Sequence, residues 1–196
     1  MIRRPPRSTH CISSAASDVY KRQTKYSYVC EKGSKPRFIK GDKMKVVPAS
    51  ELQNHVGEEV GVSDWLEVTQ ERINQFAEAT NDHQFIHVDT EMAKNTPWGT
   101  TIAHGFLTLS LIPYLSAENG IMPDNIQMAV NYGTDKVRFL EAVPVNSKIR
   151  GRFVLSDVQE KPGNRWLLKS DVTIEIEGKE KPAAIAETLA LFVVTE

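Results

Sequence analysis

An aspartate and a histidine five positions apart are the strongest candidates in this chain for a pair of proton-transferring side chains. Asp82 and His87 lie in a polar, irregular stretch, residues 81–89. A carboxylate and an imidazole can hold one water molecule between them and exchange protons with it. Taken singly, each has an ordinary explanation, because a loop Asp is usually a turn or cap residue and a lone His is usually solvated or hydrogen-bonded. The pair therefore indicates a function only in combination with other residues of the chain.

A second feature is Ala103-His104-Gly105, which opens the most apolar segment of the chain. The backbone N–H of Gly105 at the start of a helix could stabilise negative charge on a carbonyl oxygen. Glycine also permits a close approach to the backbone. The three positions together could therefore supply a base, an acid and a site for a carbonyl oxygen, without a metal.

The elements around these residues are expected to be helical first and extended later. Thr69 is a plausible N-cap for a helix in which Ile73, Phe76 and Ala77 recur at helical spacing. Shorter helices are expected over residues 50–56 and 90–94, with Thr90 capping the second, and a strand over 61–68. Residues 102–115 are apolar on most faces, which predicts one long helix that is buried all round.

The second half of the chain alternates polar and apolar residues, as strands do. Strands are predicted over residues 127–132, 136–139, 148–155, 167–176 and 184–194, with a bulge at Gly133 and hairpins at 161–164 and 177–180. An alternating sheet needs a cover on its apolar face, and the segment 102–115 can supply it. We therefore expect an α+β domain in which an antiparallel sheet wraps around one long central helix.

The first 43 residues are expected not to belong to the domain. Residues 1–9 and 13–23 back-translate in frame and in order into two adapters used for DNA sequencing libraries, with 10–12 at the place of an index. Residues 40–43 can be encoded by a ribosome-binding sequence ahead of Met44. We therefore expect 1–23 to be translated adapter, 24–43 to be upstream read-through and 44–196 to be the domain; the alternative for 24–43 is a genuine Lys-rich leader.

Removing this segment changes the charge of the chain. Residues 1–43 hold 11 of the 24 basic and 3 of the 25 acidic residues, so residues 44–196 hold 13 and 22 and carry a formal charge of −9. An acidic body argues against nucleic-acid binding. Cys11 and Cys30 both lie in the excluded segment, so the body has no disulfide or thiol nucleophile, which suits a cytoplasmic protein. No apolar run approaches the length of a membrane span.

The stretch from Asp82 to His87, followed by His104-Gly105, resembles the signature of MaoC-like dehydratases, the hydratase-2 type of (R)-specific enoyl-CoA hydratases. The resemblance continues through residues 131–139, covers essentially all of 44–196 and is closest to the nodulation protein N-like branch. It implies a hot-dog fold, a homodimer, an acyl-thioester substrate and reversible syn addition of water. It also implies Asp82 and His87 as the catalytic pair and the Gly105 N–H as the partner of the thioester carbonyl.

The chain departs from the broad family pattern at two places. Asn81 stands where a Gly usually precedes the Asp, and Gln84-Phe85 stands where Asn-Pro usually lies between the Asp and the His. The His-Gln-aromatic form fits the nodulation protein N-like branch. These differences bear on the substrate more than on the type of reaction.

Several other polar residues are candidates for a role in binding. His104, Lys136 and Arg138 are candidates for contacting the substrate or coenzyme A phosphates, although a structural role suits His104 better and exposed strands often carry Lys and Arg for solubility. The spacing of His83, His87, Asp89 and His104 matches no recognised metal-ligand motif, so no metal is expected. No cofactor is expected beyond the coenzyme A or acyl carrier of the substrate.

Two other functions are compatible with this pattern. A hot-dog thioesterase would attack the carbonyl, usually with a carboxylate on or near the central helix, but residues 102–117 contain no acidic residue. Ser110 lacks the surroundings of a serine hydrolase nucleophile. A non-catalytic acyl-thioester-binding module is the other alternative, and the intact set of Asp82, His87 and Gly105 argues against it. Acyl chain length, carrier and direction of reaction are not encoded in any of these patterns.

Overall fold

The folded part of the chain is built mainly from long strands whose side chains alternate between two faces. The computed structural model describes residues 43–195, so the expectations for residues 1–42 lie outside the described part. Along β6 from Ile149 to Leu155 the buried positions are every second residue, including Phe153. This period of two is what directs one face of the sheet to the core.

The strands and helices follow one another in the order expected for an α+β domain. The strands are β1 (Lys43–Val47), β2 (Glu59–Val62), β3 (Leu66–Glu67), β4 (Asn119–Pro123), β5 (Ile126–Phe139), β6 (Lys148–Lys161), β7 (Arg165–Ile176) and β8 (Ala184–Val194). The helices are the 3-10 helix η1 (Ala49–His55) and the α-helices α2 (Gln70–Thr80), α3 (Phe85–Val88), α4 (Thr90–Ala93), α5 (Gly105–Ser110) and α6 (Ile112–Ser116).

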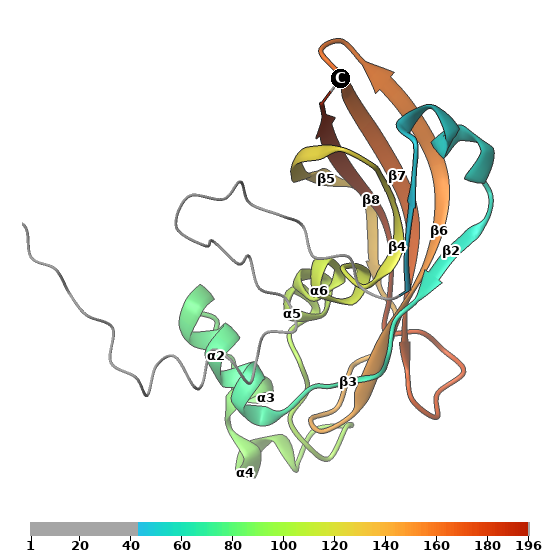
Figure 1. Ribbon diagram of the computed structural model, residues 1–196. Helices are drawn as coiled ribbons and strands as arrows, with labels where there is room; N and C mark the ends of the chain where they lie inside the picture. Colours follow the sequence, from blue (N-terminus) through green and yellow to red (C-terminus); the bar gives the residue numbers. More distant parts are fainter. Residues whose placement is uncertain (1–42, 196) are drawn as a thin grey trace, which may run out of the picture. The chain divides into compact units, whose positions relative to one another are not determined.

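The main sheet is antiparallel and has the strand order β2-β6-β7-β8-β5, with β3 also paired to β6. Strands β1 and β4 form a separate parallel pair, which the sequence pattern did not predict. The sheet curves, and α5 and α6 lie against its inner face (Figure 1). The predicted hot-dog arrangement, a sheet around a central helical segment, is confirmed.

The core joins the central helices to the sheet. From the segment 103–115, the side chains of Ala103, Leu107, Leu111, Ile112 and Leu115 are buried in one cluster with residues of the sheet. The strand residues of this cluster are Ile149, Phe153, Val172, Ile174, Ile176, Ala184 and Ala186. Burial of this apolar surface is the main favourable term that holds the helical segment in place.

The predicted single long helix over residues 102–115 was wrong in its length and in its burial. Ile102 instead forms a β-bridge with Pro144, and the helix begins only at Gly105. Pro113 has no N–H with which to continue the helical ladder, and the helix divides into α5 and α6 just before it. The segment is not buried all round, because Phe106 is 67% exposed.

Three smaller expectations need correction. The predicted strand 61–68 is interrupted at Ser63, whose hydroxyl accepts the Gly151 N–H and so replaces a ladder bond. The predicted loop 81–89 contains α3. The N-cap of α4 is Asp89 and not Thr90, because the Asp89 carboxylate accepts the N–H groups of the first turn.

Other expectations from the sequence are confirmed. The Thr69 side chain accepts the Arg72 N–H and caps α2. The two predicted strands on either side of Gly133 form one strand, β5, with a register shift between Asn131 and Gly133. Both predicted hairpins are present, between β6 and β7 and between β7 and β8. Within residues 43–195, no helix is long and apolar enough to cross a membrane.

Two isoleucines on neighbouring strands provide a test of this core. Ile174 on β7 is fully buried in the helix–sheet cluster, whereas Ile185 on β8 is 43% exposed. Ile174→Ala should lower the free energy of unfolding by about 2–5 kcal/mol, because it leaves a cavity under the central helices. Ile185→Ala, the matched control, should cost much less. Urea unfolding followed by circular dichroism measures both, and equal losses would contradict the burial described here.

Candidate functional site

Asp82 is placed by the end of helix α2. The helix stops at Asn81, whose backbone is left-handed (φ 58°, ψ 25°), and Asp82 follows in the loop with an exposed side chain. Among residues with a Cβ, Asn adopts this conformation most readily, and Gly adopts it without cost. The conformation therefore explains why the family's usual Gly can be replaced by Asn81 here.

His87 is placed by the short helix α3. In this helix Gln84 is the N-cap and Phe85 the first helical residue, which are the positions at which Asn and Pro, respectively, are favoured. The family's usual Asn-Pro is thus a helix start, and Gln84-Phe85 performs the same task without a side-chain cap. The helix directs the His87 ring into the protein, where only 7% of the residue is exposed.

The tautomer of His87 follows from its hydrogen bond. Nδ1 lies 2.7 Å from the backbone carbonyl oxygen of Ile102. A carbonyl oxygen can only accept, so Nδ1 carries the proton and Nε2 of the neutral ring has the free lone pair. Nε2 is therefore the atom of His87 that can take a proton from a ligand or a water molecule.

The surroundings of His87 favour its neutral form. Burial lowers the pKa of His87, and this effect is partly offset by the hydrogen bond to Ile102, which raises it. The neighbouring His104 lowers the pKa of His87 further, and the Asp82 carboxylate raises it. The net direction is downward, so His87 is neutral near pH 7 and can act as a base.

His104 lies against both members of the pair. Its Nε2 is 2.9 Å from the backbone carbonyl oxygen of Asp82, and its ring is stacked on the His87 ring with centroids 3.7 Å apart. Phe76 of α2 packs on the same histidine with a centroid distance of 5.1 Å. His104 is 2% exposed, so the structure does not present it to coenzyme A.

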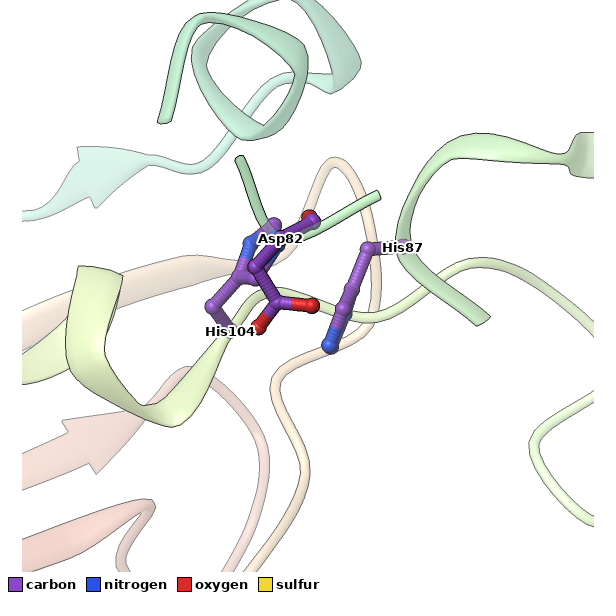
Figure 2. A group of neighbouring side chains, drawn as sticks. All are labelled: Asp82, His87 and His104. Atoms are coloured by element: carbon purple, nitrogen blue, oxygen red, sulfur yellow. The ribbon is translucent and has the colours of Figure 1, made fainter. Parts of the chain in front are cut away.

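The two predicted catalytic side chains lie close together. Figure 2 shows Asp82 beside His87 and His104. One ligand atom from each of the three residues lies within 4.8 Å of the others. The Asp82 and His87 side chains make no direct hydrogen bond, as expected if a water molecule bridges them.

Gly105 follows His104 at the start of α5. Its N–H has no acceptor among residues 43–195 and remains available to a ligand. A Cβ at this position would lie 2.9 Å from the Phe139 ring, so glycine is needed here by the packing of β5 on the helix. The sequence predicted that the substrate would approach the Gly105 backbone closely. In the structure the group that lies close to the Gly105 Cα atom is the Phe139 ring.

The three clustered side chains must also be considered as metal ligands. Each imidazole has one nitrogen engaged with a carbonyl oxygen and one nitrogen left over, as metal-bound histidines do. The two rings are however stacked with an angle of 27° between their planes. Lone pairs in nearly parallel planes do not converge on one tetrahedral ion, so the donor set fits a metal poorly.

The remaining predicted residues lie elsewhere. Lys136 on β5 forms an ion pair with Glu187 of β8 at 2.5 Å, and Arg138 donates to the neighbouring Val137 carbonyl at 2.8 Å. His83 lies 3.8 Å from Glu78. Within the described part of the chain, none of these three contacts Asp82 or His87 through a hydrogen bond or an ion pair.

Gln70 was missed by the sequence interpretation. Its amide nitrogen donates to the His87 backbone carbonyl at 2.8 Å, and its amide oxygen accepts the Thr101 hydroxyl proton. It thereby ties α2 to α3 and to the strand-like segment before α5. The partners are 17 and 31 residues away, so no periodicity or short motif could have indicated this role.

A cavity of about 370 Å³ lies between the central helices and the sheet. Leu109 and Ser110 of α5 line it, together with residues of α6, β4, β5, β7 and β8. Leu109 is one helical turn, about 6 Å along the axis, from Gly105. The cavity is mostly apolar and therefore suited to a hydrocarbon chain.

The fold is shared with several solved structures. The structure described as monoamine oxidase regulatory protein from Archaeoglobus fulgius superposes with a TM-score of 0.65 at 23% identity, over 81% of this chain and 100% of that one. The unliganded R-hydratase PhaJ1 from Pseudomonas aeruginosa superposes with a TM-score of 0.58 at 20% identity, over 76% and 87%. At these identities the likeness concerns the fold.

Sequence comparison gives the family. A profile described as MaoC like domain matches residues 51–175. The chain is 44% identical over 144 residues to 3-hydroxyacyl-thioester dehydratase Z of Mycobacterium tuberculosis (strain CDC 1551 / Oshkosh), covering 74% of this chain and 95% of the relative. It is 42% identical over 149 residues to nodulation protein N of Rhizobium meliloti (strain 1021), covering 76% and 92%. The chain therefore belongs to the family of MaoC-like dehydratases.

Proposed function

We propose that this protein is a hydro-lyase that interconverts a 2-enoyl thioester and a 3-hydroxyacyl thioester by adding or removing water. The observation that carries the proposal is the Asp82–His87 pair, in which a neutral imidazole with a free Nε2 lies beside a carboxylate. Relatives named as dehydratases support the same class of reaction. The more specific assignment is (R)-selective syn hydration of a trans-2-enoyl thioester.

The pair would act on a single water molecule. One O–H bond of the water breaks and its proton passes to the Asp82–His87 pair, while the oxygen bonds to C3 of the substrate. The electrons of the double bond move toward the thioester oxygen, which accepts a hydrogen bond from the Gly105 N–H. C2 then takes a proton from the pair, and the water has been added without any other reactant.

The remainder of the substrate would lie on either side of this point. The acyl chain would enter the apolar cavity, which Leu109 lines one helical turn beyond Gly105; Asp82, His87 and Gly105 themselves do not line it. Coenzyme A or an acyl carrier would be part of the substrate, and Arg138, next to Phe139, is the better placed of the two predicted phosphate contacts. Lys136 is less suited, since Glu187 already neutralises it. We also propose that the reaction takes place in the cytoplasm, because residues 44–196 contain no cysteine, which suits a reducing compartment.

The assay that tests this function uses crotonyl-CoA and longer 2-enoyl-CoAs. Loss of the absorbance of the conjugated enoyl group measures hydration directly. Release of free thiol from saturated acyl-CoA, measured in parallel, would indicate the thioesterase alternative. Tight binding with neither reaction would indicate a non-catalytic module.

Substitution of the pair tests the assignment of the catalytic residues. Asp82→Asn keeps the size of the side chain but removes the proton acceptor, and His87→Ala removes the imidazole. Each should lower kcat for crotonyl-CoA by at least about 100-fold, the contribution typical of a general acid–base group. The double variant should lose little more than either single one, because the two groups act as a unit.

His83→Ala is the control for these variants. His83 is in the same loop but is directed to Glu78, so its loss should leave kcat close to that of the wild type. If Asp82→Asn hydrated crotonyl-CoA at the wild-type rate, the proposed pair would be incorrect even though the fold stands.

We also propose that the reaction requires no metal ion, since the stacked rings of His87 and His104 fit a metal poorly. Prolonged dialysis against EDTA should leave kcat and KM unchanged. Zinc added afterwards should inhibit or have no effect. Loss of activity on dialysis, followed by recovery with a divalent cation, would overturn this part of the proposal.

A homodimer is proposed from the exposure of strand β5. This strand is at the edge of the main sheet, pairs only with β8 in the described residues, and exposes ten consecutive residues, 127–136. Met128, Val130 and Tyr132 are 51%, 40% and 63% exposed. An apolar, unpaired edge is a liability unless another chain covers it, and a second copy of β5 is self-complementary in the way a two-fold dimer requires.

The dimer can be tested by light scattering. At micromolar concentration the mass should be about twice the 22.0 kDa of one chain. Val130→Lys should shift the mass toward one chain, because it introduces a charge into the edge. Val56→Lys changes a similarly exposed valine outside β5; it is the matched control and should leave the dimer intact. A wild-type protein with the mass of a single chain would contradict the proposal.

A further inference from the structure

We propose that His104 is a positioning residue, which holds both members of the Asp82–His87 pair in their working arrangement without contacting the substrate. This inference rests on the proposed function and adds a third residue to the site. It goes beyond a purely structural role, in which His104 would only fill space in the core.

His104 has no atom to offer a substrate. Only 2% of the residue is exposed. Its Nε2 is engaged with the Asp82 carbonyl oxygen, and its Nδ1 is buried and has no hydrogen-bond partner in the described part of the chain. Because a carbonyl oxygen only accepts, the proton of the neutral ring must be on Nε2. A direct part in proton transfer with the substrate is therefore closed to both nitrogens.

The ring instead reaches each catalytic group by a separate contact. The 2.9 Å hydrogen bond fixes the backbone of Asp82 at the point where the chain leaves the left-handed Asn81. The other contact is the stacking on His87, whose centroid is 3.7 Å away. Phe76 packs on the His104 ring as well and limits its movement.

The place of His104 in the chain adds a third connection. It directly precedes Gly105, whose free N–H is the proposed partner of the thioester oxygen. One residue thus connects the backbone of Asp82, the imidazole of His87 and the backbone donor of Gly105. Displacement of reacting groups by about 1 Å can cost roughly 100-fold in rate, so a residue that spaces all three should affect kcat strongly.

Three substitutions separate the two contacts. His104→Gln retains an N–H donor at about the position of Nε2 but has no ring. His104→Phe retains a flat ring for stacking but no donor, and His104→Leu retains neither. We expect His104→Leu to lower kcat for crotonyl-CoA about 10–100-fold, with KM unchanged because the substrate is not contacted. Gln and Phe should each recover part of the loss.

Thermal unfolding separates positioning from mere packing. If His104 only fills space, kcat should follow the melting temperature, and Phe and Leu should differ in kcat only as they differ in stability. If the His104→Leu protein does not fold, comparison of the His104→Gln and His104→Phe proteins with the wild type provides the same test. A wild-type kcat in a folded His104→Leu or His104→Phe protein, or a loss confined to KM, would overturn the inference.

A measurement that does not depend on activity completes the test. Nitrogen-15 NMR of the histidine side chains in the wild-type protein should show the His104 proton on Nε2 and the His87 proton on Nδ1. A His104 proton on Nδ1 would overturn the inference whether or not the enzyme hydrates crotonyl-CoA. A wild-type protein with the expected tautomers but no hydratase activity would overturn the proposed function and leave the positioning geometry standing.

Discussion

The hydrogen bond from His87 Nδ1 to the Ile102 carbonyl is the interaction on which the rest of the site depends. It fixes the tautomer, so that the free lone pair is on Nε2, and it joins α3 to the segment that leads into α5. The Ile102 N–H returns a hydrogen bond to the Ile86 carbonyl at 3.0 Å. The peptide segment at Ile102 therefore positions the imidazole and also leads directly to Gly105 at the start of α5.

The fold serves this arrangement by giving it a rigid base. Apolar side chains of α5 and α6 are buried against β6, β7 and β8, and this packing fixes where Gly105 lies. Helix α2 ends directly before Asp82 and so positions it, and Gln70 joins α2 to α3. The site is thus assembled from three short segments, each held by elements whose own stability comes from burial rather than from the polar contacts of the site.

Much of this arrangement could be predicted from the sequence, for identifiable reasons. Alternation over residues 148–155 and 172–177 indicated the sheet, and the concentration of Leu and Ile in residues 102–115 indicated its cover. The resemblance to MaoC-like dehydratases supplied Asp82, His87 and Gly105. Apolar content alone could not show that Ile102 bridges to Pro144, because the two residues are far apart in the sequence. It also could not show that the helix divides before Pro113, because that division follows from the missing N–H of the proline.

The long-range contacts of the site were the least predictable. Gln70 contacts residues that are 17 and 31 positions away in the sequence. His104 contacts His87 and Asp82, which are 17 and 22 positions away. The departures from the family pattern, by contrast, become simple once the backbone is known. Asn81 occupies a left-handed position that Gly also suits, and Gln84-Phe85 occupies a helix start that Asn-Pro also suits. Both substitutions therefore suit the backbone conformations that place Asp82 and His87.

In the proposed function, Asp82 and His87 act together on one water molecule, on one face of the substrate. The most direct measurement is to hydrate crotonyl-CoA in D2O and to determine by NMR the configuration of the product at C2 and C3. We expect (R)-3-hydroxybutyryl-CoA with deuterium at C2 on the same face as the new hydroxyl. Addition of deuterium and hydroxyl to opposite faces, or an (S) product, would contradict it.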